Sequence, residues 1–135
     1  WQYKFNVHMA RIEAAEESLD KAIKVIKDGI RIGEISHTIG SFLRKKGLRA
    51  AADLGGHGIG KKIHDDPYIA NEGPSNYGMT LKEGMTIAIE PIVTEGNGKI
   101  VVGDDNWTIY TKDGAWVSHF EHTILVLKNG CEKLT

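Results

Sequence analysis

The chain has 135 residues, a length that suits one compact domain covering residues 1–135. Hydrophobic residues make up 41% of it and charged residues 26%, which excludes collagen-like and strongly disordered chains and predicts a packed core. The formal net charge is −1 and the charges form no basic stripe, so we expect no nucleic-acid partner.

The sequence also favours a cytoplasmic protein. No apolar run approaches the roughly 20 residues that span a bilayer, and no signal peptide is visible, so we expect no membrane partner. The single cysteine, Cys131, cannot form an internal disulfide and suits a reducing compartment. The first residue is Trp1 rather than methionine, which leaves open whether the chain is a fragment of a longer protein.

Two amphipathic helices are predicted in the first third of the chain. Apolar residues recur at helical spacing from Ile12 to Ile30, and Asp28-Gly29 is a typical helix end. A second apolar stripe runs from Ile35 to Leu43, and Gly47 ends it. The first seven residues are interpreted as a candidate edge strand, with aromatic side chains at Trp1, Tyr3 and Phe5.

After residue 48 the pattern changes to loops and strands. Residues 53–84 are punctuated by glycine and proline and are predicted to be loops. Helices followed by an antiparallel sheet indicate an α+β fold, with two N-terminal helices packed on a mostly antiparallel sheet. The predicted strands are 85–90, 100–102 after a hairpin turn at Asn97-Gly98, 107–111, 117–127 as the longest, and a last strand after Asn129-Gly130 that ends near Leu134.

Two histidines lie in the glycine-rich segment. His57 stands between glycines, which leave its imidazole uncovered and let a ligand approach the backbone. It is therefore a candidate metal ligand or general base, although this pentapeptide alone slightly favours a tight turn with a surface histidine. His64 follows seven residues later and either converges on the same pocket or stays in solvent beside Asp65 and Asp66.

Two glutamates stand in predicted strands. A carboxylate in an apolar strand is expensive to bury unless it is paired or bound to a metal. Pro91 cannot donate to a strand ladder, so the strand must bend, bulge or lie at an edge beside Glu90, or simply end and leave Glu90 in water. Glu121 lies inside the long strand 117–127, where a functional role is favoured over an exposed strand end.

His57, Glu90 and Glu121 together make a plausible ligand set for a hard cation, since carboxylates can bridge two ions. The remaining histidines have simpler interpretations. His8 and His37 are expected on the surface, and His122, which alternation points away from Glu121, is expected to be a core histidine with its hydrogen bonds satisfied.

In this order and spacing, the segments resemble the methionine aminopeptidases, and most of the chain takes part in the likeness. The Phe-Glu-His-Thr context of Glu121 favours this family over aminopeptidase P, prolidase and creatinase, and the absence of a long insert favours its first type. The matching segments are 56–60 (Gly-His-Gly-Ile-Gly), 64–67 (His-Asp-Asp-Pro), 81–91 (ending in Ile-Glu-Pro), 107–114, 121–123 and 129–135.

The resemblance implies the C-terminal half of the pita-bread fold, with a curved sheet, and a metalloaminopeptidase that removes the N-terminal methionine of peptides and nascent proteins. It implies that one or two divalent ions (cobalt, manganese, iron or zinc) activate a water molecule. His57, Glu90 and Glu121 match metal ligands, so His57 belongs to the catalytic centre. His64 matches a catalytic histidine that contacts the substrate near the scissile peptide, and Trp107 matches a tryptophan near the methionine pocket.

The sequence also departs from the family. The family's site includes two aspartates from the preceding half, eleven residues apart, and no two aspartates of this chain have that spacing. His119 stands where the family generally has glutamine. Three ligands can still hold one ion, so we expect weaker or single-ion binding, and the hypothesis for a complete site is a homodimer or a complementing N-terminal half. The alternative function is a partial module that binds peptide N-termini or a protein partner without turnover.

Overall fold

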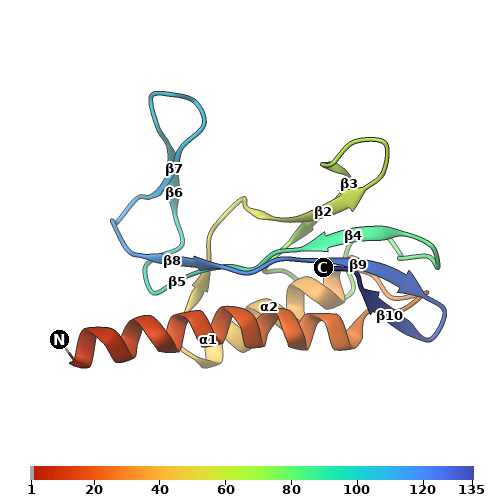
Figure 1. Ribbon diagram of the computed structural model, residues 1–135, viewed down its shortest axis with the longest axis horizontal. Coiled ribbons are helices and arrows are strands. Elements are labelled where there is room, and N and C mark those ends of the chain that lie inside the picture. Colours follow the sequence, from red (N-terminus) through yellow and green to blue (C-terminus); the bar gives the residue numbers. More distant parts are fainter. Residues whose placement is uncertain (1) are drawn as a thin grey trace.

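A computed structural model describes the backbone of residues 2–135 and the side chains from His8 onward. Two helices lie side by side on one side of antiparallel sheets (Figure 1), so the predicted α+β class is confirmed. The helices are α1 (Gln2–Val25) and α2 (Ile32–Lys45), and the strands are β1 (Arg49–Ala50), β2 (Gly55–Ile59), β3 (Asp65–Ala70), β4 (Thr86–Ile89), β5 (Ile92–Thr94), β6 (Ile100–Val102), β7 (Ile109–Thr111), β8 (Val117–His119), β9 (His122–Leu127) and β10 (Gly130–Lys133).

Helix α1 begins earlier and ends earlier than predicted. The edge strand predicted for the first seven residues is wrong from Gln2 onward, because α1 already includes them, and Trp1 lies outside the described residues. A helix extends cheaply once nucleated, whereas an isolated strand must find a partner. At the other end, backbone hydrogen bonds to distant segments replace the last helical turn: Asp28 N–H donates to Leu127 and Gly29 N–H donates to Leu81.

The glycine-rich segment predicted to be loops contains two strands. β2 lies between β3 and β4 in a five-stranded sheet of order β10-β9-β4-β2-β3. A Cβ on Gly56 would collide with the carbonyl oxygen of Ala88, and a Cβ on Gly58 would collide with that of Asp66. The glycines therefore let β2 approach its neighbours closely. The high glycine content alone predicted loops, because it does not distinguish a turn from a closely packed strand.

The predicted hairpin at Asn97-Gly98 is also wrong. β5 pairs with β1 and β8 in a second sheet of order β1-β5-β8, while β6 pairs with β7. Gly98 adopts a φ of +79°, but its carbonyl accepts a 2.7 Å hydrogen bond from Ala52 N–H. The Asn-Gly turn is thus bonded to the turn that follows β1, instead of folding β5 onto β6.

The single long strand predicted for 117–127 is broken in two. β8 belongs to the three-stranded sheet and β9 to the five-stranded sheet. The break leaves Phe120 and Glu121 between β8 and β9. The neighbouring strands break at the same level, with Glu90 and Pro91 between β4 and β5. Pro91 has no N–H to donate, so the ladder is interrupted there as expected, and its carbonyl accepts a long 3.4 Å contact from Phe120 N–H.

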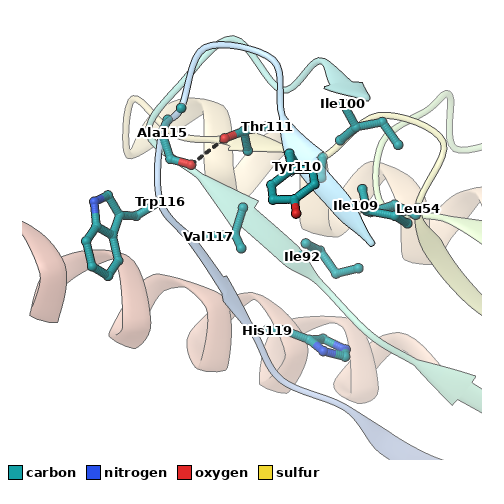
Figure 2. A pocket seen from close by; sticks show the side chains of 12 residues that line it. Leu54, Ile92, Ile100, Ile109, Tyr110, Thr111, Ala115, Trp116, Val117 and His119 are labelled. Carbon is teal, nitrogen blue, oxygen red and sulfur yellow. Dashed lines mark hydrogen bonds between the residues drawn. The ribbon is translucent and has the colours of Figure 1, made fainter. Parts of the chain in front are cut away.

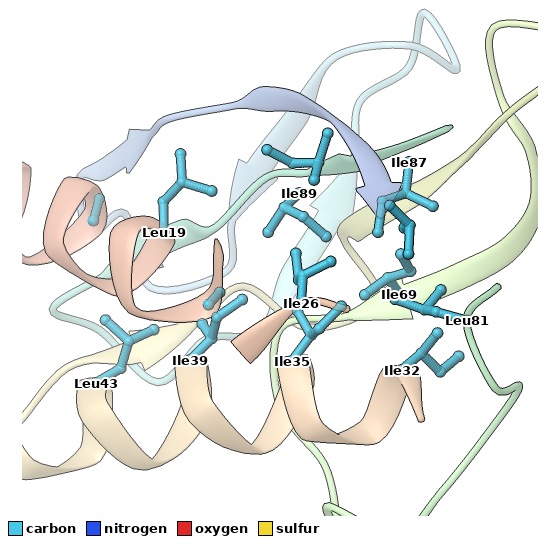
Figure 3. Close-up of a cluster of buried hydrophobic side chains, with 14 of the residues drawn as sticks. Leu19, Ile26, Ile32, Ile35, Ile39, Leu43, Ile69, Leu81, Ile87 and Ile89 are labelled. Carbon is cyan, nitrogen blue, oxygen red and sulfur yellow. The ribbon is translucent and has the colours of Figure 1, made fainter. Parts of the chain in front are cut away.

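The core lies between the helices and the five-stranded sheet (Figure 3). Ile87 and Ile89 of β4 and Ile124 of β9 point to the helices, where Ile35 and Ile39 of α2 meet them. Since side chains alternate along a strand, the intervening residues of β4 and β9 face away from the helices. The face of the sheet opposite the helices therefore carries polar residues, His57 among them.

The β6–β7 hairpin projects away from the rest of the fold (Figure 1). The carboxylate of Asp105 organises its tip by accepting hydrogen bonds from the backbone N–H groups of Trp107 and Thr108 and from the Thr108 hydroxyl. These bonds, the one from the Thr108 side chain first, lower the pKa of Asp105 to about 2.

No helix among residues 2–135 is long and apolar enough to cross a membrane.

Replacing Ile39 with alanine should destabilise the fold by about 2–5 kcal/mol, because the side chain is fully buried and its loss leaves a cavity. Ile12 was predicted to share the apolar stripe, but it is 37% exposed, so Ile12→Ala should cost less than about 0.5 kcal/mol. Urea unfolding followed by circular dichroism measures both changes. Equal losses in the two variants would contradict the position of the core.

The hydrogen bonds at the tip of the β6–β7 hairpin depend on pH through the Asp105 carboxylate. Because the folded-state pKa of Asp105 is depressed, its stabilising bonds are complete above the ordinary aspartate pKa and are lost as the pH falls through about 2. Thr108→Val removes the hydroxyl donor and should raise the pKa of Asp105 toward its ordinary value of 3.8. Carboxyl-carbon NMR titration of both proteins tests this, and an unchanged midpoint would show that the hydroxyl has no such effect.

Candidate metal centre

The two strand breaks place two glutamates opposite each other on one face. Ile89 pairs with His122 before the break and Ile92 pairs with His119 after it, so Glu90 and Glu121 lie in the gap between these pairs. Glu121 is exposed and Glu90 has 16% of its side chain exposed. The expectation that Glu121 lies mid-strand is wrong, because it occupies the gap between two strands.

His57 reaches the same face from β2. It pairs with Ala88 of β4, so both side chains point away from the helices, and Glu90 follows two residues after Ala88. The Nε2 atom of His57 lies 3.5 Å from a carboxylate oxygen of Glu90, and only 12% of the His57 side chain is exposed. Its other nitrogen, Nδ1, lies 2.9 Å from the carbonyl oxygen of Gly58, which holds the ring in orientation and favours a proton on Nδ1.

His57, Glu90 and Glu121 thus converge, with one ligand atom from each lying within 4.8 Å of the others. One imidazole and two carboxylates are suitable donors for a divalent first-row cation. Two carboxylates held this close repel each other unless a positive charge lies between them. The donor set and its electrostatics therefore fit a cation, and three protein ligands leave coordination positions open for water or substrate.

The sequence singled out His119 only as a departure from the family's glutamine, and the structure places it against the same glutamate. Its Nε2 atom lies 3.3 Å from the second oxygen of Glu90. The interaction with Glu90 is the main cause that raises the pKa of His119, burial opposes it, and the charge of Glu121 adds to it. His119 stands two residues before Glu121, so alternation along the predicted strand 117–127 puts both on one face, which was the available signal in the sequence.

Tyr68 is a residue that the sequence did not reveal. It lies in β3 directly opposite His57, so its ring extends the same face of the sheet. Partial burial raises the pKa of its hydroxyl, and the negative charges of Asp53 and Glu90 raise it further. The phenol stays protonated near neutral pH and can donate a hydrogen bond at the edge of the site.

His64 and Trp107 are placed differently. The ring of His64 lies 4.4 Å from that of His57 in an edge-on arrangement, and His64 is exposed on the loop between β2 and β3. The two histidine rings therefore lie together, and His64 also stays exposed to solvent beside them. Trp107 is 85% exposed on the β6–β7 hairpin, where its backbone N–H donates to Asp105.

The other histidines depart partly from expectation. His37 is exposed on α2, as predicted, but His8 is half-buried and packs against Trp116 with ring centroids 5.2 Å apart. His122 is half-buried, and its buried Nδ1 has no hydrogen-bond partner, so it is not the satisfied core histidine that alternation suggested.

An apolar pocket of about 530 Å³ adjoins the site (Figure 2). The β6–β7 hairpin forms one wall with Ile109 and Tyr110, and β5 and β8 form the other with Ile92 and Val117. His119 lies at the edge of this pocket nearest Glu90. The pocket therefore joins an apolar surface to the group of candidate ligands.

Comparison with known proteins places this geometry in a family. The chain is 47% identical over 124 residues to a methionine aminopeptidase of Mycoplasma capricolum, which covers 92% of this chain and 49% of that protein. A methionine aminopeptidase 1 of Bacillus subtilis is 41% identical, with 92% and 50% covered. The chain spans about half the length of the curated relatives it matches.

Solved structures give the same result. The crystal structure of methionine aminopeptidase from Thermotoga maritima superposes with a TM-score of 0.89 at 47% identity, over 93% of this chain and 50% of that one. Prolidase from Pyrococcus furiosus superposes at 0.70 with 25% identity, over 93% and 31%, so the fold is shared across pita-bread enzymes. Residues 4–128 also match the sequence profile of metallopeptidase family M24, and the chain therefore belongs to that family.

Proposed function

We propose that this chain supplies half of the active centre of a methionine aminopeptidase, which hydrolyses the first peptide bond of proteins and peptides that begin with methionine. The convergence of His57, Glu90 and Glu121 carries the proposal, because it provides a cation site on an open face. The names of the most similar relatives support the substrate. They favour this enzyme over a module that binds N-termini without turnover.

A divalent cation at this site would supply Lewis acidity and make a water molecule nucleophilic near neutral pH. His57 and the two glutamates hold the charge in place, and the Gly58 carbonyl keeps the imidazole oriented. His64 stands beside His57 but reaches solvent, so it can contact the peptide and stabilise the developing oxyanion with a hydrogen bond. The role of Trp107 at the methionine side chain stays a prediction.

We further propose that residues 1–135 act as one domain and that the protein is cytoplasmic. We also propose that the site binds one or two ions of cobalt, manganese, iron or zinc. A site with an imidazole ligand suits these transition metals better than magnesium or calcium.

A second copy of the chain, or a complementing N-terminal half, is proposed to complete the centre. The pocket and hairpin leave large apolar side chains in solvent, which favours a covering partner. We propose that the covering partner is a second copy in a homodimer, the commonest symmetric assembly. The exposed residues concerned are Val101, Val102, Ile109, Tyr110, Trp116 and Val117.

The cation site is tested by Glu121→Ala. The substitution removes one of three ligands, so the affinity for cobalt or manganese should fall at least by the roughly 10–100-fold that loss of a supporting residue costs. Isothermal titration calorimetry of the 135-residue chain measures it. Glu132→Ala on β10, also exposed, is the matched control and should bind as the parent does. Equal affinity in all three proteins would refute the ligand set.

The catalytic role of His64 is tested with a Met-Ala peptide and saturating manganese. His64→Ala should lower kcat roughly 100- to 1000-fold, as expected for loss of an oxyanion donor, with unchanged metal affinity. Lys62→Ala, on the same exposed loop, should retain full activity. Peptide binding without methionine release by the parent chain would instead support the binding module, and hydrolysis of X-Pro peptides alone would support a prolidase-like enzyme.

The homodimer is tested by sedimentation velocity with and without manganese. A species of twice the 14.9 kDa chain mass is expected, and Tyr110→Lys on the exposed hairpin should dissociate it. A monomer under both conditions would leave a complementing half as the occupant of this face.

A further inference from the structure

Each oxygen of Glu90 faces a different imidazole. Oε1 lies 3.5 Å from Nε2 of His57, and Oε2 lies 3.3 Å from Nε2 of His119. The proposed ligand group uses only the first of these contacts. His119 therefore needs a physical explanation of its own.

The separations suit shared coordination better than a direct ion pair. A charge-assisted N–H to carboxylate bond is typically about 2.7–2.9 Å long, shorter than either contact. Nitrogen and oxygen ligands about 2.1 Å from a tetrahedral zinc ion lie about 3.4 Å from each other. Both contacts of Glu90 fall within a few tenths of an ångström of that spacing.

The backbone holds His119 in this position. It is the last residue of β8 and pairs with Ile92, the first residue of β5, so it lies directly at the break that exposes Glu90. Its side chain is 45% exposed, which leaves the ring accessible to an ion arriving from solvent. Figure 2 shows the ring at the end of β8, away from the apolar side chains of the hairpin.

We propose that His119 is a further metal ligand of this chain and binds a divalent cation through Nε2 beside Oε2 of Glu90. The two oxygens of Glu90 would then each share a cation with a different imidazole, Oε1 with His57 and Oε2 with His119. The proposal rests on the proposed function, since it takes Glu90 as a ligand. A second imidazole compensates in part for carboxylates that the chain does not contribute, and it shifts the preference of the site toward zinc and cobalt.

The decisive measurement is a zinc titration of the 135-residue chain with ¹⁵N-labelled histidines, followed by two-bond proton–nitrogen NMR. Zinc should shift the Nε2 resonances of both His57 and His119 to metal-bound values, while His37 on α2 stays unchanged as an internal control. A shift of His57 alone would overturn the role of His119 and leave the proposed function intact. The absence of any shift would refute both.

The matched variants are His119→Gln and His37→Gln. Glutamine can still donate a hydrogen bond to Glu90, so His119→Gln removes the imidazole ligand but not the polar contact. Its affinity for zinc, measured by competition with a chromophoric chelator, should fall about tenfold or more, and His37→Gln should match the parent. Parent-like affinity in His119→Gln would show that His119 is no ligand.

Discussion

Two neighbouring strands leave the five-stranded sheet at the same point, and the candidate centre depends on this shared break. Pro91 cannot donate to the ladder, so β4 ends before it. The segment paired with it is interrupted opposite, at Phe120 and Glu121. Each interruption frees one glutamate from a regular strand position. The two carboxylates then approach the imidazole of His57, which the neighbouring strand β2 presents from the side.

The electrostatics of the centre follow from that geometry. Glu90 is largely buried and loses hydration, and its negative charge is repelled by the exposed Glu121 nearby. A divalent cation resolves both costs at once, and the open face opposite the helices gives it access. The helices matter indirectly, because the apolar residues that they cover, Ile87 and Ile89 among them, force Glu90 and its neighbours onto the other face.

The hairpin β6–β7 is organised at its tip by Asp105 and presents Trp107 and Tyr110 to solvent instead of to the core. Monomeric proteins rarely leave large apolar patches exposed, so this surface supports the proposed homodimer. The apolar pocket and the cation site are adjacent, since His119 lines the pocket and contacts Glu90, so a partner over the pocket would also cover the cation site.

The sequence by itself determined the family, the helix α2 with its buried stripe, and the three candidate ligands, because apolar period and motif order are local properties of the chain. Tertiary structure decided the rest. The end of α1 depends on hydrogen bonds to Leu81 and Leu127, and the strand β2 depends on neighbours that only glycine lets approach. The contact of His119 with Glu90 likewise exists only because two breaks far apart in sequence align, and no local pattern encodes an alignment between distant segments.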